Sequence, residues 1–137
     1  MAICEYLEEL LPDPVLVGAT PEERARTRMW VRRIDLTITE PMVAGFRAAE
    51  GRSMFESRMR VLDGDAAPEL KRIATEGLRY VDEQMVDRPW IAGDRFTLAD
   101  IVLYAFVEFG GMGSASHCPS RFPSSQHGKL ASPSVRG

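Results

Sequence analysis

The chain has 137 residues, an apolar fraction of 45% and a formal net charge of −3, which suits one globular domain. This small negative charge gives no electrostatic reason to expect a nucleic acid or an anionic membrane as a partner. No apolar run approaches the roughly 18 residues of a membrane span, and the acidic N-terminus is unlike a secretory signal. We expect a cytoplasmic protein, because two cysteines form no disulfide framework.

The first predicted element is a short amphipathic helix within residues 1–11. Its apolar side chains recur at spacings of three and four, which places them on one helical face. The segment "LPDP" then ends the helix, because proline has no amide proton and restricts the residue before it. A helix this short is marginal alone, so its apolar face must pack on something. That face consists of Ile3, Tyr6, Leu7 and Leu10.

The longest predicted helix follows a linker over residues 12–19. Thr20 and Glu23 have the spacing of a capping box, and Pro21 suits the first helical position. Pro41 lies inside the apolar stripe of this helix. Because the apolar spacing continues past Pro41, we expect a kink there rather than an end. The stripe comprises Val31, Ile34, Ile38, Met42 and Phe46.

A second long helix is predicted from about Pro68 to Met85, where apolar residues again share one stripe. The segment "VDRPWIAGD" after it has the composition of a loop. Trp90 and Ile91 within this loop are expected to fill a hydrophobic gap.

The next segment, "FTLADIVLYAFVEF", has the clearest helix start in the chain. Thr97 is the expected N-cap, and Asp100 stands three residues later, so each side chain can bond the other residue's free backbone amide. Phe96 and Ile101 are placed to form a hydrophobic staple across this cap. The residues that follow are apolar nearly all round. We therefore predict a central helix that other helices must cover.

No segment shows convincing strand-like alternation, so the predicted fold class is all-α, a helical bundle. The composition then changes sharply after Phe109. Every Asp and Glu of the chain stands at or before Glu108, whereas the remainder is basic and rich in Ser, Gly and Pro. Such a break indicates a domain edge or a disordered tail.

The segment "WIAGDRFTLADIVLY" resembles the capping-box region of the glutathione S-transferase C-terminal helical domain. In that family a Gly-Asp pair and then Ser/Thr-x-Ala-Asp open the central buried helix. The matching residues are Gly93, Asp94, Thr97, Ala99 and Asp100. The resemblance implies a helical bundle of that type over residues 20–111.

The N-terminal segment "MAICEYLEELLPDPVLVG" resembles the last helix of the family's thioredoxin-like domain and the linker after it. The family pattern is Glu-Ser-x-Ala-Ile-x-x-Tyr-Leu, of which only the second half is matched. The resemblance therefore implies the end of a thioredoxin-like domain over residues 1–11, a linker over 12–19 and a chain truncated at both ends. The matching residues are Met1, Ala2, Ile3, Tyr6 and Leu7.

This resemblance implies the conjugation or reduction of small electrophiles, with glutathione as the cosubstrate. In the family, the thioredoxin-like domain holds the tripeptide and stabilises its thiolate. Activation of the glutathione thiol needs the stabilising group that this domain supplies. We therefore expect no catalytic residue in this chain and little activity. We also expect no glutathione to be bound by the chain alone.

The family domain continues past its central helix with further helices, whereas residues 112–137 show no helical period. One hypothesis is a reading-frame shift near Gly111 to Gly113. The alternative is a genuine irregular or disordered tail.

Two sets of residues become candidate sites through the resemblance. In several members an Asp at the position of Asp35 reaches the glutathione of the other subunit of a dimer. The alternative is a surface ion pair between Asp35 and one of Arg28, Arg32 or Arg33. The second set resembles the segment that lines the electrophile pocket, although the same pattern is common in plain core. It comprises Ile38, Pro41, Met42 and Gly45.

The remaining candidates are weaker. Cys4 has no histidine near it in sequence and suits a structural role. Cys118, His117 and His127 match no zinc spacing, so no metal is expected. The expected partners are a second copy of the chain, bound through the long helices, and a small hydrophobic electrophile. Two alternatives remain open: a non-catalytic dimerisation or docking module, and a degenerate product that does not fold stably.

Overall fold

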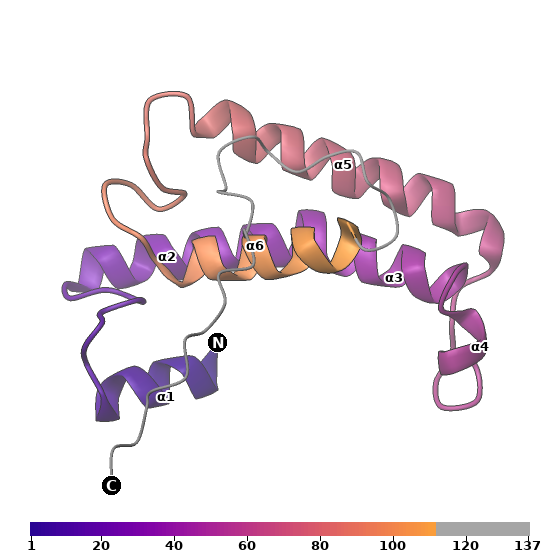
Figure 1. Cartoon of the computed structure of the whole chain (residues 1–137), viewed down its shortest axis with the longest axis horizontal. Coiled ribbons are helices and arrows are strands. Elements are labelled where there is room, and N and C mark those ends of the chain that lie inside the picture. The colour runs from indigo at the N-terminus through magenta and orange to yellow at the C-terminus, as the bar shows by residue number, and fades with distance from the viewer. Residues whose placement is uncertain (112–137) are drawn as a thin grey trace, which may run out of the picture.

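The computed structural model describes residues 1–111, and within them every regular element is helical (Figure 1). The predicted all-α class is confirmed. The expectations for residues 112–137, including Cys118 and both histidines, lie outside the described residues. The elements are α1 (Ala2–Leu10), α2 (Pro21–Ile34), the π-helix η1 (Asp35–Thr39), α3 (Glu40–Ala48), α4 (Arg52–Phe55), the 3-10 helix η2 (Gly64–Ala66), α5 (Ala67–Gln84) and α6 (Leu98–Gly111).

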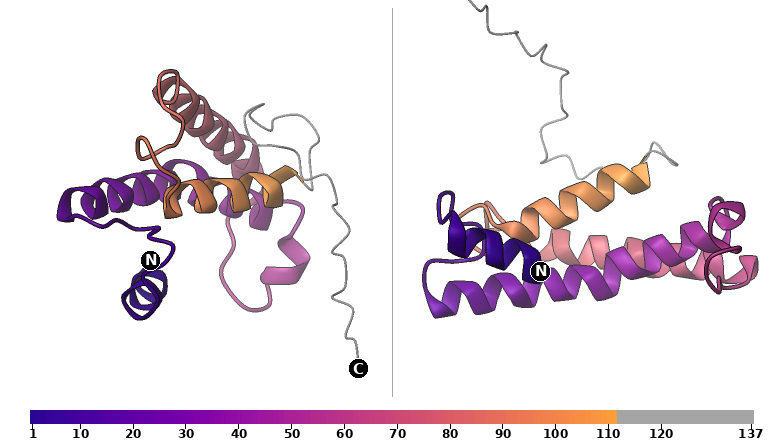
Figure 2. Two further views of the ribbon diagram at one scale, coloured as in Figure 1. Left: turned by 60° about the vertical axis from the view of Figure 1, so that its left-hand side comes forward. Right: turned by 90° about the horizontal axis from the view of Figure 1, so that it is seen from below.

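Three of these elements, α2, η1 and α3, join into one continuous rod (Figure 2, right). It begins at the predicted capping box, in which Thr20 Oγ1 accepts from the Glu23 N–H and Glu23 accepts from the Thr20 N–H. The irregularity expected at Pro41 takes the form of the π-helix just before it. Proline has no N–H to donate to the Thr37 carbonyl, and the Glu40 N–H bonds instead to Asp35 O.

Helix α5 packs against η1 and α3, and it comes close to η1 at Gly77. A Cβ atom on Gly77 would lie 2.5 Å from the Thr37 carbonyl oxygen and 2.8 Å from Ile38 Cγ1. The carbonyl that Pro41 leaves without its usual donor therefore faces the one position of α5 without a side chain. Gly77 lets the two backbones approach this closely.

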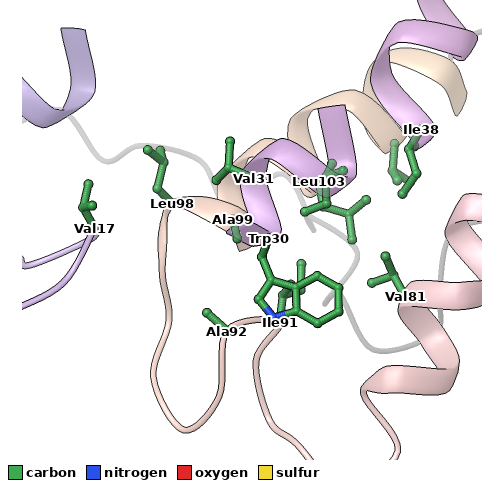
Figure 3. Close-up of a cluster of buried hydrophobic side chains, with 12 residues drawn as sticks. Val17, Trp30, Val31, Ile38, Val81, Ile91, Ala92, Leu98, Ala99 and Leu103 are labelled. Carbon is green, nitrogen blue, oxygen red and sulfur yellow. The ribbon is translucent and has the colours of Figure 1, made fainter. Parts of the chain in front are cut away.

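Helix α6 lies along α2, and the two share the main core with the loop before α6 and the linker before α2 (Figures 1 and 3). Ile91 fills the core as predicted, at 1% exposure, whereas Trp90 is only partly buried. The buried cluster comprises Val17, Trp30, Val31, Ile34, Ile38, Val81, Ile91, Ala92, Leu98, Ala99, Leu103 and Val107.

Cover over α6 is incomplete among the described residues. Leu103 and Val107 are buried, but Ala105 is exposed and Phe109 is 49% exposed. The helices before α6 therefore supply only part of the cover that its apolar sequence requires. None of the helices in this part of the chain is long and apolar enough to cross a membrane.

Candidate functional site

The most completely built polar site surrounds the carboxylate of Asp100, which is fully buried. Its Oδ2 accepts from the Thr97 N–H at 2.8 Å and from the Thr97 hydroxyl at 2.9 Å. Its Oδ1 accepts from the Ile91 N–H at 3.0 Å. The carboxylate thus joins the start of α6 to the loop that brings Ile91 into the core.

Half of the predicted reciprocal cap is present at this site. Asp100 bonds the Thr97 amide as expected, but the Thr97 hydroxyl accepts from the Ala99 N–H at 3.3 Å rather than from the Asp100 N–H. The Asp100 amide bonds instead to the Thr97 carbonyl at 3.1 Å. The bond to Ile91 was not predicted, because a separation of nine residues carries no periodic signal.

The two staple residues lie on either side of the cap. Phe96 is 42% exposed and packs edge-to-face on Trp90, with ring centroids 5.0 Å apart. Ile101 is half-buried against the core cluster. A direct contact between Phe96 and Ile101 stays a prediction.

Asp35 lies at the first position of η1 and is paired with Arg32, at 2.6 Å between Oδ2 and Nη1. Arg32 also reaches Glu40 at 3.5 Å. The Asp35 side chain keeps 39% of its surface exposed. The surface ion pair foreseen as the alternative is therefore present, and the carboxylate stays accessible to solvent.

The four residues of the predicted electrophile pocket divide between two directions. Ile38 is fully buried in the core, and Gly45 is buried facing α5, where an added Cβ would lie 3.4 Å from Leu70 Cβ. Half-buried Met42 packs against the same core cluster as Ile38, on the side of α6, where its sulfur would lie 2.7 Å from a Cβ placed on Gly110. Pro41 is buried.

An aromatic cluster stands near Met42 at one end of the bundle. The Phe46 ring contacts Phe109 and Phe55 edge-to-face, at centroid distances of 5.8 and 6.4 Å. The guanidinium of Arg47 lies 5.1 Å from the Phe55 ring centre. These residues come from α3, α4 and α6, and no sequence pattern predicted that they would meet. They make this end of the bundle apolar and partly open.

A second carboxylate site, also unforeseen, joins α1 to the linker. Glu8 accepts from the backbone N–H groups of Leu16, Val17 and Gly18, at 2.7, 2.6 and 3.3 Å. Partial burial disfavours ionisation of Glu8, but these three donors and nearby Arg24 outweigh it, so the pKa of Glu8 lies below its usual value.

These observations describe an all-helical domain whose last described helix, α6, begins at a buried capping carboxylate. The family model described as "Glutathione S-transferase, C-terminal domain" matches residues 42–123 of the sequence. This match spans more than half of the chain, so the protein belongs to the glutathione S-transferase C-terminal domain family.

Individual relatives agree with this assignment. Glutathione S-transferase 2 of Saccharomyces cerevisiae is 30% identical over 111 residues, which cover 81% of this chain and 47% of the yeast protein. FtsZ-localized protein A of Caulobacter vibrioides is 32% identical over 106 residues, which cover 77% and 46%. The crystal structure of Gtt2 from Saccharomyces cerevisiae superposes with a TM-score of 0.71 at 30% identity, covering 81% of this chain and 53% of that one. The chain spans about half the length of these relatives.

Proposed function

We propose that the chain is the helical half of a glutathione transferase, which conjugates or reduces small electrophiles with glutathione as cosubstrate. The observation that carries this proposal is the family match, together with a yeast transferase as a relative. The activity of the longer relatives is extended to this chain as a proposal, since the chain spans about half of their length.

Within this function, the 137 residues contribute the electrophile side of the site and do not activate glutathione. The two best-bonded carboxylates among the described residues, Asp100 and Glu8, are occupied by backbone donors and therefore serve structure. The half-buried Met42 and the partly exposed aromatic cluster of Phe46, Phe55 and Phe109 offer an apolar surface that suits an aromatic electrophile.

Asp35 is the residue that we propose to contact glutathione across a homodimer. Its exposed carboxylate could accept from an ammonium group, and Arg32 is the only competing partner that the structure records for it among the described residues. Exposed Met29 and Leu36, each at 46%, lie on the same stretch of the rod and support an interface there. We place the protein in the cytoplasm, where Cys4 would stay a free thiol.

Ligand titration tests whether the chain binds the electrophile but not glutathione. An apolar aryl electrophile should shift the amide resonances of Met42 and Phe46 in a saturable way. Reduced glutathione should shift none of the amides at comparable concentration. Saturable glutathione binding, or no electrophile binding at all, would contradict the proposal.

A second candidate function is a non-catalytic docking module, and one specific observation favours it. A relative at 32% identity is named for localisation to FtsZ rather than for transfer chemistry. A docking module should form a defined oligomer and bind neither glutathione nor the electrophile. Because both candidates predict an oligomer, the titrations above separate them: electrophile binding favours the transferase half, and its absence favours the docking module.

A further inference from the structure

Helix α1 turns its apolar face away from the bundle. The predicted stripe is formed, but Ile3 is 76% exposed and Leu7 is 50% exposed, and no residue of α1 is buried. Figure 2 (left) shows α1 standing apart from the rod and from α6. Apolar packing therefore does not explain why α1 sits where it does.

Polar contacts from two glutamates connect α1 to the rest of the described chain. Glu8 accepts hydrogen bonds from three consecutive linker N–H groups, those of Leu16, Val17 and Gly18, at 2.7, 2.6 and 3.3 Å. Glu5 forms a two-pronged pair with Arg28 of α2, at 2.7 Å to Nε and 3.0 Å to Nη2. Both glutamates are on one helical face, three residues apart.

The linker that receives Glu8 is itself fastened to the bundle. Val17 is 3% exposed in the core, and the Leu16 carbonyl accepts from the Leu98 N–H at 2.9 Å. Arg95 donates to the Val15 carbonyl at 2.5 Å. Gly18 is held against α2, because a Cβ there would lie 2.5 Å from the Arg24 nitrogen. The three N–H groups thus form a rigid set of donors for one carboxylate.

We propose that α1 is a detachable arm, latched to the bundle by the Glu8 carboxylate in its cradle of linker N–H groups and steadied by the pair of Glu5 with Arg28. The arm can leave while residues 20–111 stay folded, because the core contains no side chain from α1. Each bond to Glu8 is charge-assisted and partly shielded from water, which makes it stronger than an exposed ion pair.

The charged groups around the latch keep it closed at neutral pH. Arg24 faces Glu8 from α2, Arg28 and the N-terminal amine face Glu5, and Glu9 acts on Arg28. The pKa values of Glu8 and Glu5 are both lowered. Lowered carboxyl pKa values stabilise the docked arm above their ordinary range, and this stabilisation is lost only as pH falls through the lowered values.

Amide hydrogen exchange on the full 137-residue chain, at one neutral pH, tests the latch. In Glu8→Gln, exchange of the amides of residues 5–10 and 16–18 should accelerate by about tenfold or more, the change expected for losing a charge-assisted bond. A free nine-residue helix is marginal, so its amides lose protection once released. Helices α2, α5 and α6 should exchange as in the parent.

Glu9→Gln is the matched control, since it removes the same charge from the exposed neighbouring position of α1. It should leave exchange at residues 16–18 unchanged. Glu8→Ala should reproduce the effect of Glu8→Gln. Unchanged exchange of α1 in both Glu8 variants would overturn the latch. Equal acceleration throughout α2, α5 and α6 would also overturn it, because the arm would then not be separable.

Discussion

Among single residues, we expect Asp100 to contribute most to the stability of the fold. Its replacement by Ala would leave the Ile91 and Thr97 amides buried without their acceptor. Each such amide costs about 1–3 kcal/mol, so we expect Asp100→Ala to lower the free energy of unfolding by roughly 3 kcal/mol. Urea unfolding followed by tryptophan fluorescence measures this. A loss below about 0.5 kcal/mol would mean that the carboxylate does not hold the loop.

Thr97 provides a finer test of the same cap. Thr97→Ala removes the hydroxyl that accepts from Ala99 and donates to Asp100, and should cost about 1 kcal/mol. Thr97→Ser keeps the hydroxyl and is the control, with most of the parent stability retained. Equal thermal stability of the Ala variant and the parent would contradict the assigned cap.

Asp35 should behave differently from Asp100, because its ion pair with Arg32, the only one it makes within residues 1–111, is at the surface. Asp35→Asn is expected to change the free energy of unfolding by less than about 0.5 kcal/mol. An unchanged free energy of unfolding would agree with a role of Asp35 in binding rather than in folding. A large loss in thermal unfolding would instead assign Asp35 to the internal stability of the rod.

At the scale of elements, the contact between α5 and η1 depends on Gly77. Alanine is favoured over glycine within a helix by about 1 kcal/mol. At Gly77, however, a Cβ would meet the Thr37 carbonyl oxygen at 2.5 Å, which neither backbone can relieve without moving. We expect Gly77→Ala to destabilise the protein by about 1–3 kcal/mol.

Gly45 supplies the matched control within the same helix pair. Its added Cβ would meet Leu70, Ala67 and Lys71 at 3.4–3.5 Å, an ordinary contact distance. Gly45→Ala should therefore be neutral or stabilising in chemical unfolding. If Gly77→Ala were equally harmless, the close approach of α5 to Thr37 would be refuted.

The elements also show which features the sequence could predict. Local signals placed the helix start at Thr20 and the cap at Thr97 and Asp100, because caps and apolar stripes act within a few residues. They also predicted a helix from about Pro68 to Met85, which the structure has over Ala67–Gln84. The π-helix before Pro41 was expected only as a kink. The bonds of Glu8 to the linker and of Asp100 to Ile91 join residues eight or more apart, which no periodicity encodes.

The candidate site was less predictable than the fold. The sequence placed Ile38 and Met42 on one stripe, and the structure keeps them together, because Ile38 lies in the core cluster and half-buried Met42 packs against it. Gly45, from the same predicted pocket, faces α5 instead. The aromatic cluster around Phe46 depends on three elements and could not be read from any one segment.

At the scale of the whole molecule, the described bundle leaves apolar surface on several faces. Phe109 on α6, Leu36 on the rod and Ile3 on α1 are all substantially exposed. The chain also spans about half the length of its relatives. Both facts agree with the proposal that these residues act as one half of a larger transferase site.

The proposed function is tested best by the rate at which the purified 137-residue chain conjugates glutathione to an activated aryl chloride. Circular dichroism on the same sample must first show a helical, folded protein. We expect a rate equal to that of the uncatalysed reaction, although the electrophile itself binds. Saturable turnover well above that background would contradict it, because the described helices and their tail would then activate the glutathione thiol by themselves.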